Sequence, residues 1–174
     1  PKPGGGCRRI KASSYLFSSD IAPPKRWSYR VVHLAAARTS AALMEGAIPG
    51  RLLPNHTYEL NGYKYTTDAQ GRIKTVEGEL RPDPAKRNKS AQSGVGADDG
   101  RQSSDQGGHL IGSQFGGYRG VENLTPMDKE INNYHKGEWG KMEKRWADEL
   151  KAGKSVIVRI EITYADDSMR ATGF

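Results

Sequence analysis

A single histidine lies among glycines in the stretch "DQGGHLIGSQFGGYRGVENLTPMDKEINN", residues 105–133. A neutral imidazole has an ordinary pKa near 6.5 and can accept a proton from water at neutral pH. Gly107 and Gly108 leave the backbone beside His109 bare, which would let a large substrate approach closely. The apolar pair Leu110 and Ile111 would anchor a strand that carries the histidine. A purely structural histidine is the commoner alternative.

Two asparagines in the same stretch lie at positions that suit different roles. Asn123 precedes "LTPM", a helix-entry pattern that would place Pro126 early in a short helix, "PMDKEIN", and Asn123 would then cap a turn. Asn132 lies near the end of that predicted helix. It is either a C-terminal cap or an oxygen ligand for a hard cation. Mg²⁺ keeps several waters and often needs only one or two protein oxygens besides substrate phosphate.

A carboxylate follows on the next predicted helix, where Glu143 stands between Met142 and Trp146. On a helix that already carries many charges, a solvated surface glutamate is the plain interpretation. The functional alternative is a carboxylate that accepts hydrogen bonds from the waters of a metal ion.

The composition limits the class of protein. The chain has 174 residues, a net charge of +7, a pI near 9.5 and a mean hydropathy of -0.76. A basic domain of this size favours an anionic partner, with nucleic acid as the first candidate, although a basic surface without a partner is the alternative.

The sequence has no long apolar run, so we expect no membrane insertion. It also shows no signal-peptide pattern. The single Cys7 excludes an internal disulfide, and we give it no catalytic role.

The elements that must position these residues can be expected from local patterns. Residues 1–26 suggest a linker or N-terminal arm, and residues 27–45 a helix. Asn61-Gly62 lies between aromatic and β-branched residues and predicts a type I′ hairpin within a three-stranded antiparallel meander over 57–80. The polar segment 81–104 predicts a long loop that helps to form the site.

The last part of the chain has two clear periodicities. Apolar residues at helical spacing over 139–150, followed by Gly153, predict a helix and its end. Alternation over 155–164 predicts a half-buried strand. Strands followed by helices and a further strand indicate the α+β class.

Three motifs together resemble the bacterial DNA/RNA non-specific endonucleases, which are ββα-metal (His-Me finger) nucleases. The motifs are "DQGGHLIGSQFGG", "NLTPMDKEIN" and "GEWGKMEKRWADELKAGKSVIVRIEITY". The segment "NHTYELNGYKYTTDAQGRIKTVEGELRPDPAKRNKSAQ" is similar to the branch found as toxin domains of polymorphic bacterial toxins. The resemblance covers about residues 55–165, within a nuclease domain expected over 27–174. It implies a ββα-metal core with an antiparallel sheet and a metal-bearing helix.

The resemblance also implies roles for individual residues. His109 would be the general base, Asn132 the sole direct protein ligand of Mg²⁺ (with Mn²⁺ as a substitute), and Glu143 the support of the metal's water shell. Asn133 competes with Asn132 because this chain has extra residues, "NYHKGE", before Trp139. An upstream arginine would bind phosphate. Our candidate is Arg87, with alternatives at positions 101 and 119, because the motif arginine common in the family is absent beside His109.

Further contacts and partners are expected on the same basis. The expected substrate-binding residues are Asp105, Gln106, Gly108, Arg119 and Asn123. The substrate would be DNA, with RNA left open, and the products would carry 5′-phosphates. A cognate immunity protein is expected if the domain is the toxin module of a larger protein that is secreted or delivered into a target cell. The rivals are a non-catalytic basic nucleic-acid-binding domain and, with four histidines and no HExxH motif, a zinc hydrolase.

Overall fold

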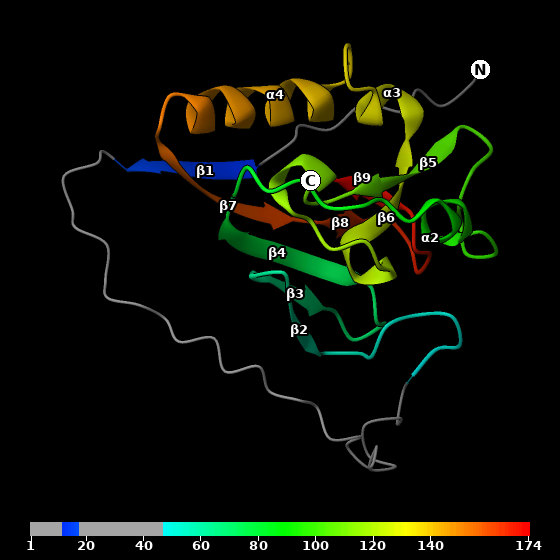
Figure 1. Ribbon diagram of the computed structural model, residues 1–174. Helices are drawn as coiled ribbons and strands as arrows, with labels where there is room; N and C mark the ends of the chain where they lie inside the picture. Colours follow the sequence, from blue (N-terminus) through cyan, green and yellow to red (C-terminus); the bar gives the residue numbers. More distant parts are fainter. Residues whose placement is uncertain (1–11, 18–46) are drawn as a thin grey trace.

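The computed structural model describes residues 12–17 and 47–174 (Figure 1). The helix expected over 27–45 and Cys7 lie outside the described residues. Within the segment expected as a linker or arm, Ala12–Phe17 forms strand β1, which pairs antiparallel with a strand near the end of the chain. At least this part of residues 1–26 therefore belongs to the sheet.

A five-stranded antiparallel sheet in the order β1-β7-β4-β3-β2 forms the centre of the molecule. The expected meander over 57–80 is confirmed as three strands, β2 (Thr57–Leu60), β3 (Tyr63–Thr67) and β4 (Ile73–Glu79). Asn61 and Gly62 both have positive φ, 53° and 79°, as a type I′ turn requires.

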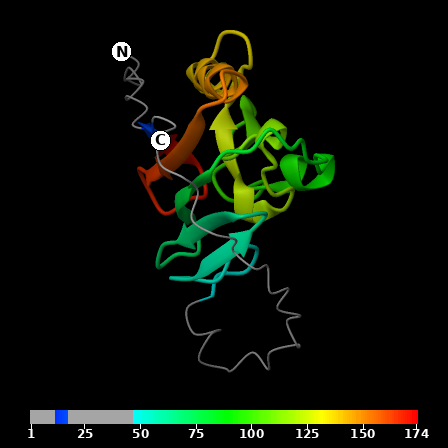
Figure 2. The same cartoon turned by 60° about the vertical axis from the view of Figure 1, so that its left-hand side comes forward.

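The expected C-terminal helix and strand are also confirmed. Helix α4 (Glu138–Lys151) is followed by β7 (Ser155–Glu161), whose alternate residues are buried. Trp139, Met142 and Trp146 bury the apolar side of α4 in the same core as the inward face of the sheet. In both views α4 lies at one end of the molecule and the β2–β3 hairpin at the other (Figures 1 and 2).

A second, two-stranded sheet carries the histidine motif. Strand β5 (Asp105–His109) pairs antiparallel with β6 (Leu124–Asp128), and helix α3 (Lys129–Asn132) follows directly. This is the ββα order that the resemblance implied, and the fold class is α+β as expected. Pro126, however, lies in β6 opposite Gly107, so its expected place early in a helix is wrong. The helix instead starts after Asp128, whose side chain accepts a hydrogen bond from the Glu130 N–H.

The segment 81–104, expected as a long loop that helps to form the site, contains a short helix, so the expectation of a loop over its whole length is wrong. Helix α2 (Lys89–Gly94) begins at Asn88, whose side-chain oxygen accepts a hydrogen bond from the Ala91 N–H at 3.1 Å. Four polar residues in six hid this helix, which is shorter than the window over which an apolar period becomes visible.

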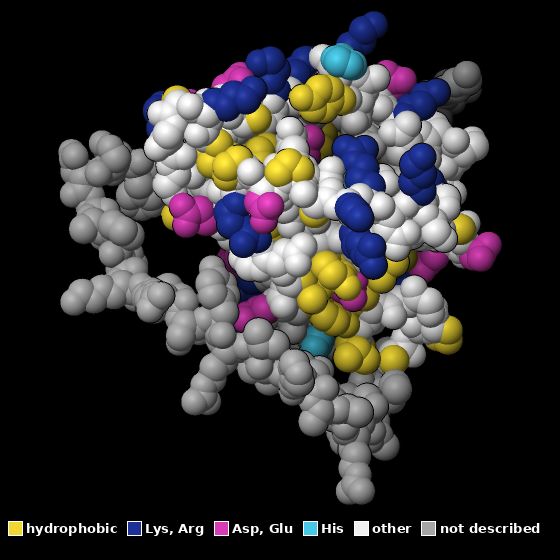
Figure 3. All heavy atoms as spheres, in the orientation of Figure 1, with side chains coloured by type: hydrophobic (Ala, Val, Ile, Leu, Met, Phe, Trp, Pro, Cys, Tyr) yellow, Lys and Arg dark blue, Asp and Glu magenta, His cyan; other side chains and the backbone are white. Residues whose placement is uncertain are grey.

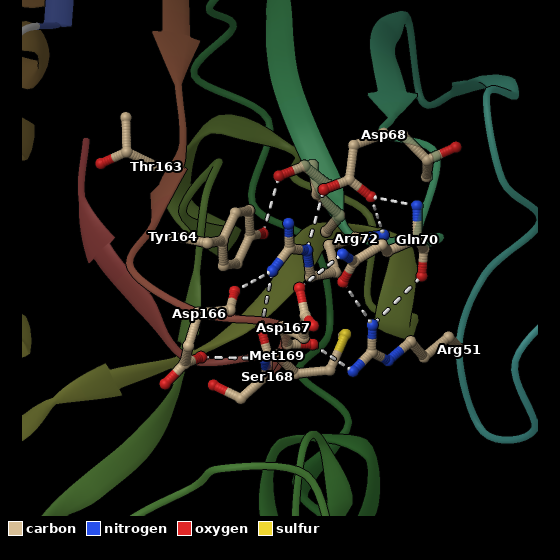
Figure 4. Close-up of polar contacts among 12 residues, drawn as sticks. Arg51, Asp68, Gln70, Arg72, Thr163, Tyr164, Asp166, Asp167, Ser168 and Met169 are labelled. Carbon is tan, nitrogen blue, oxygen red and sulfur yellow. Dashed lines mark hydrogen bonds and ion pairs between the residues drawn. The ribbon is translucent and has the colours of Figure 1, made fainter.

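A polar network ties the end of the chain to the meander (Figure 4). Strands β8 (Thr163–Tyr164) and β9 (Ala171–Gly173) form a hairpin whose connecting loop offers backbone carbonyls to two arginines. Arg72 donates to the carbonyls of residues 166 and 168, and Arg51 donates to that of residue 167. The Arg72 guanidinium also lies 4.1 Å from the centre of the Tyr164 ring. These contacts fix the hairpin against the sheet.

Among residues 12–17 and 47–174, no helix is long and apolar enough to cross a membrane.

Candidate active site

One cavity of about 480 Å³ brings together side chains from four separate segments of the chain. His109 comes from the end of β5, Asn132 from the last turn of α3, Glu143 from α4, and Arg87 from the segment that precedes α2. These four residues were expected to act together from the sequence alone. The fold places them around one space although they are spread over 57 positions of the sequence.

His109 is held in a buried position at the end of β5. Its backbone pairs with Leu124 of β6, and only 7% of the residue is exposed. Burial, with the positive charge of Arg87 as a smaller cause, lowers the pKa of the imidazole to about 4. The ring is therefore neutral at physiological pH and has a nitrogen free to accept a proton.

Asn132 and Asn133 both line the cavity but differ in what their amides bind. The Asn133 oxygen Oδ1 accepts hydrogen bonds from the N–H groups of His135 and Lys136, at 3.0 and 2.9 Å. The Asn132 Nδ2 donates to Gln106 Oε1 at 2.9 Å. That bond orients the Asn132 amide and, among the described contacts, leaves its oxygen without a donor. Asn132 is thus better suited than Asn133 to offer an oxygen to a cation.

Glu143 lies half-buried on the cavity wall beside Gly112. A Cβ built on Gly112 would come within 2.3 Å of the Glu143 Oε1, so a side chain at position 112 would force the carboxyl group to move. Burial raises the pKa of Glu143 to about 7, and the charge of Arg87 opposes this rise only in part. Such a carboxyl group gains strongly from a nearby positive charge or from hydrogen-bond donors.

Of the three arginines considered for phosphate binding, Arg87 alone lines this cavity. Its Nε donates to Ser113 Oγ at 3.0 Å, and this bond directs the guanidinium. Arg101 donates instead to backbone carbonyls at the end of α2, including those of Gln92 and Ser93 at 2.9 and 2.8 Å. Arg119 is exposed outside the lining of this cavity. The placement supports Arg87 as the candidate.

Asp105 and Asn123, two of the expected substrate-binding residues, lie inside the protein. Asp105 accepts hydrogen bonds from Arg170 at 2.8 and 3.0 Å. Burial alone would raise the pKa of Asp105, but the bonds from Arg170 and from the backbone keep it below its ordinary value. Asn123 is fully buried, and its amide bonds the backbone of Ile111 and Tyr118. These positions favour structural roles for both residues.

The glycines beside the histidine are explained by packing of the chain on itself. A Cβ on Gly107 would meet the Gln92 carbonyl oxygen at 2.2 Å, and one on Gly108 would meet the Met127 side chain at 2.9 Å. Gly107 lines the cavity, whereas Gly108 faces Met127 in the interior. The room left by the missing side chains of these two glycines is therefore filled by Gln92 and Met127. The stretch also contributes bulky core residues, contrary to its glycine-rich appearance, and these are Leu110, Ile111, Phe115, Leu124 and Met127.

Sequence reasoning missed two contributors to the site, Gly112 and Ser113, and gave a third, Gln106, a different role. Gln106 was expected to touch substrate, but its hydrogen bond to Asn132 makes it an orienting residue. Ser113 holds Arg87, and Gly112 makes room for Glu143. The only available signal was their nearness to His109 in "GHLIGSQF", which did not tell which partners they face.

The charge around this region is mainly positive on one face. Lysine and arginine side chains gather over the part of the molecule that contains β5, β6 and α2 (Figure 3). Over residues 47–174, no three His, Cys, Asp or Glu side chains cluster in a way that could hold a metal ion, so that part of the chain offers no zinc-type ligand set.

Comparison with known proteins gives two concordant results. The family model described as DNA/RNA non-specific endonuclease matches residues 54–174. The type VII secretion system protein EssD of Staphylococcus aureus strains USA300 and NCTC 8325 / PS 47 is 40% identical to this chain. The similarity covers 72% of the chain and 21% of EssD. The chain thus corresponds to about a fifth of the length of these relatives.

Proposed function

The chain belongs to the DNA/RNA non-specific endonuclease family, and from that premise we propose that it hydrolyses phosphodiester bonds in nucleic acids with the help of a divalent cation. The observation that carries the proposal is the convergence of His109, Asn132, Glu143 and Arg87 on one cavity. The chemistry needs a neutral base, an oxygen ligand for the metal ion, a carboxyl group beside the metal's waters and a positively charged side chain for the phosphate. These groups are supplied in that order by His109, Asn132, Glu143 and Arg87.

The residues present fit a hard divalent cation such as Mg²⁺, or Mn²⁺ in its place. The Asn132 oxygen is free because Gln106 holds the amide by its nitrogen. Glu143 is close to half-protonated at neutral pH without a cation, so it is ready to give up its proton and accept hydrogen bonds from bound water. A bound cation would supply charge that stabilises the phosphate and the leaving oxygen as negative charge develops on them.

The protein's own groups would act as follows. An unprotonated nitrogen of His109 accepts a proton from water, and the resulting hydroxide forms a bond to phosphorus while the bond to the 3′-oxygen breaks. The leaving oxygen takes a proton from solvent, so the products carry a 5′-phosphate and a 3′-hydroxyl. Arg87, directed by Ser113, offers its remaining N–H groups to the phosphate oxygens, whose charge grows in the transition state.

Contacts to phosphate carry no base information, so we expect low sequence specificity. Binding through lysine and arginine releases counterions from the nucleic acid, and its affinity should fall steeply as salt rises. The steep salt dependence follows from the positive face near the cavity, and the low sequence specificity follows from contacts made to phosphate.

The biological setting is proposed from the relative. EssD is named as a type VII secretion system protein, and we infer that this domain is the toxin module of a larger exported protein. A producing cell would then need an inhibitor of the nuclease, and an acidic immunity protein would suit the basic face. Co-purification of the domain with the product of an adjacent gene would support this, and failure to find any inhibitor in the producing strain would count against it.

The test measures the cleavage of DNA and of RNA in parallel with a series of divalent cations. A reaction in EDTA is the metal-free control. Asn132→Ala is compared with Asn133→Ala, its matched neighbour. We expect the first to lose cation-dependent cleavage and the second to keep most of it. If the protein binds nucleic acid but cleaves none with any freshly added cation, the hydrolase proposal is refuted. The alternative of a non-catalytic nucleic-acid-binding domain would then hold.

A further inference from the structure

An exposed aromatic side chain stands at the edge of the proposed active site. Tyr134 lines the same cavity as His109 and Asn132, and 56% of it is exposed. Its place in the cavity lining leaves the aromatic face open to a molecule that enters the site.

The backbone under Tyr134 is rigidly held. A Cβ on Gly140 would come within 2.3 Å of the Tyr134 carbonyl oxygen and 2.5 Å of its Cα, so this backbone packs directly on the first turn of α4. Asn133 closes the loop by accepting the N–H groups of His135 and Lys136, and its own carbonyl accepts the N–H of Gly137 at 2.8 Å. The backbone that carries the ring is thus tied to α4 and to its own loop.

The surroundings of the ring suit a nucleic acid strand. The His135 ring contacts the Tyr134 ring edge to face, with centres 5.2 Å apart, and steadies it. Lys129 and Arg87 line the cavity together with Glu130 and Glu143, and exposed Lys136 lies two residues after Tyr134 in the same loop, so cationic groups are within the same site as the ring. Aromatic faces with nearby cations are how proteins hold single strands, because every base has a flat face that can stack.

We propose that Tyr134 stacks on an unpaired nucleobase next to the bond that is cut, and so makes the enzyme favour single-stranded over duplex substrates. This inference rests on the proposed function of the same cavity. In a duplex the base faces are already stacked on each other, so the tyrosine gains nothing there. Stacking of one base contributes about 5- to 100-fold in affinity, and the preference should have that size.

The experiment uses oligonucleotides with one hydrolysable linkage, single-stranded or annealed to a complement, and an abasic analogue placed on each side of the linkage in turn. The proteins are wild type, Tyr134→Ala, Tyr134→Leu and Tyr134→Phe. We expect the alanine and leucine variants to lose about 5- to 100-fold in kcat/KM on the single strand and less than about twofold on the duplex. The phenylalanine variant should keep the wild-type preference. One abasic position should harm the wild type and not the alanine variant.

Binding of the single strand, measured by fluorescence anisotropy in EDTA, separates the two proposals. If wild type cuts no substrate, the proposed function fails, and the same loss of binding in Tyr134→Ala would still support the stacking. Equal effects of Tyr134→Ala on both strands, or full activity in Tyr134→Leu, would overturn the stacking alone. The side chain is mainly exposed, so thermal unfolding of the variants should match the wild type.

Discussion

Replacing Glu143 by glutamine should make the protein more stable and less active at once. Burial raises the pKa of this carboxyl group from 4.5 to about 7, so the folded protein resists its ionisation. The unfolded chain ionises freely above pH 4.5, and rising pH therefore favours unfolding until the folded group has also ionised, above about pH 7. Glutamine has nearly the same shape, which the tight contact with Gly112 requires, and it does not ionise.

The size of the effect follows from the two pKa values. At about 1.4 kcal/mol for each tenfold change in proton affinity, a fully shielded carboxyl group would cost about 3 kcal/mol above pH 7. Glu143 is only half-buried and the cavity admits water, so we expect Glu143→Gln to raise the free energy of unfolding by about 1 to 3 kcal/mol at pH 8. This corresponds to about 2 to 10 °C in Tm for a chain of this size.

The assay is urea unfolding of wild type and variant in EDTA, at pH 8 and at pH 5. The gain should be large at pH 8 and should shrink to under about 1 kcal/mol at pH 5, where the wild-type group is protonated in the folded protein. Glu138→Gln is the matched control, because Glu138 is exposed on the same helix and its replacement should change stability by less than about 0.5 kcal/mol. An unchanged or lowered stability at pH 8, or a gain that does not depend on pH, would refute the reasoning.

Three further predictions concern other residues in and behind the site. Arg87→Ala should reduce kcat by about 10²- to 10³-fold, and the acid limb of kcat/KM should move to higher pH, because the loss of a positive charge raises the pKa of His109 from its value of about 4. Gly112→Ala should displace the carboxyl group of Glu143 and cost about 10- to 100-fold in kcat with an unchanged circular dichroism spectrum. Asn123→Ala should destabilise the protein by about 2 to 4 kcal/mol in urea unfolding, because buried backbone groups lose their partners, while folded molecules keep their activity.

The elements predicted correctly are those whose pattern is local. The Asn61-Gly62 turn needs two residues that accept positive φ, and the sequence supplies them side by side. The α4 helix has 14 residues and the β7 strand has 7, so each is long enough for the alternation of buried and exposed positions to show in the sequence.

The errors come from distant partners. Pro126 is compatible with a helix start, but its pairing with Gly107 across the β5–β6 sheet puts it in a strand, and nothing near Pro126 in the sequence indicates that. Asp105, which we expected to contact substrate, finds a partner in Arg170, 65 positions away, and no local pattern indicates this pairing. Contacts of this kind depend on the tertiary fold.

The candidate site was expected from a resemblance of motifs, and the structure adds the physical reasons for several of its members. The free oxygen of Asn132 depends on Gln106, and the direction of Arg87 depends on Ser113. Neither bond could be inferred from spacing, because each joins segments 26 residues apart.

The proton acceptor is the centre of the mechanism, and single-turnover cleavage of an oligonucleotide by wild type and His109→Ala at pH 7.5 with Mg²⁺ tests it most directly. Folding of the variant is checked by its circular dichroism and its binding to the same oligonucleotide. We expect the rate of bond cleavage to fall by about 10²- to 10⁴-fold while binding changes little. A variant that binds and cuts at nearly the wild-type rate would contradict the assignment of His109 as the base.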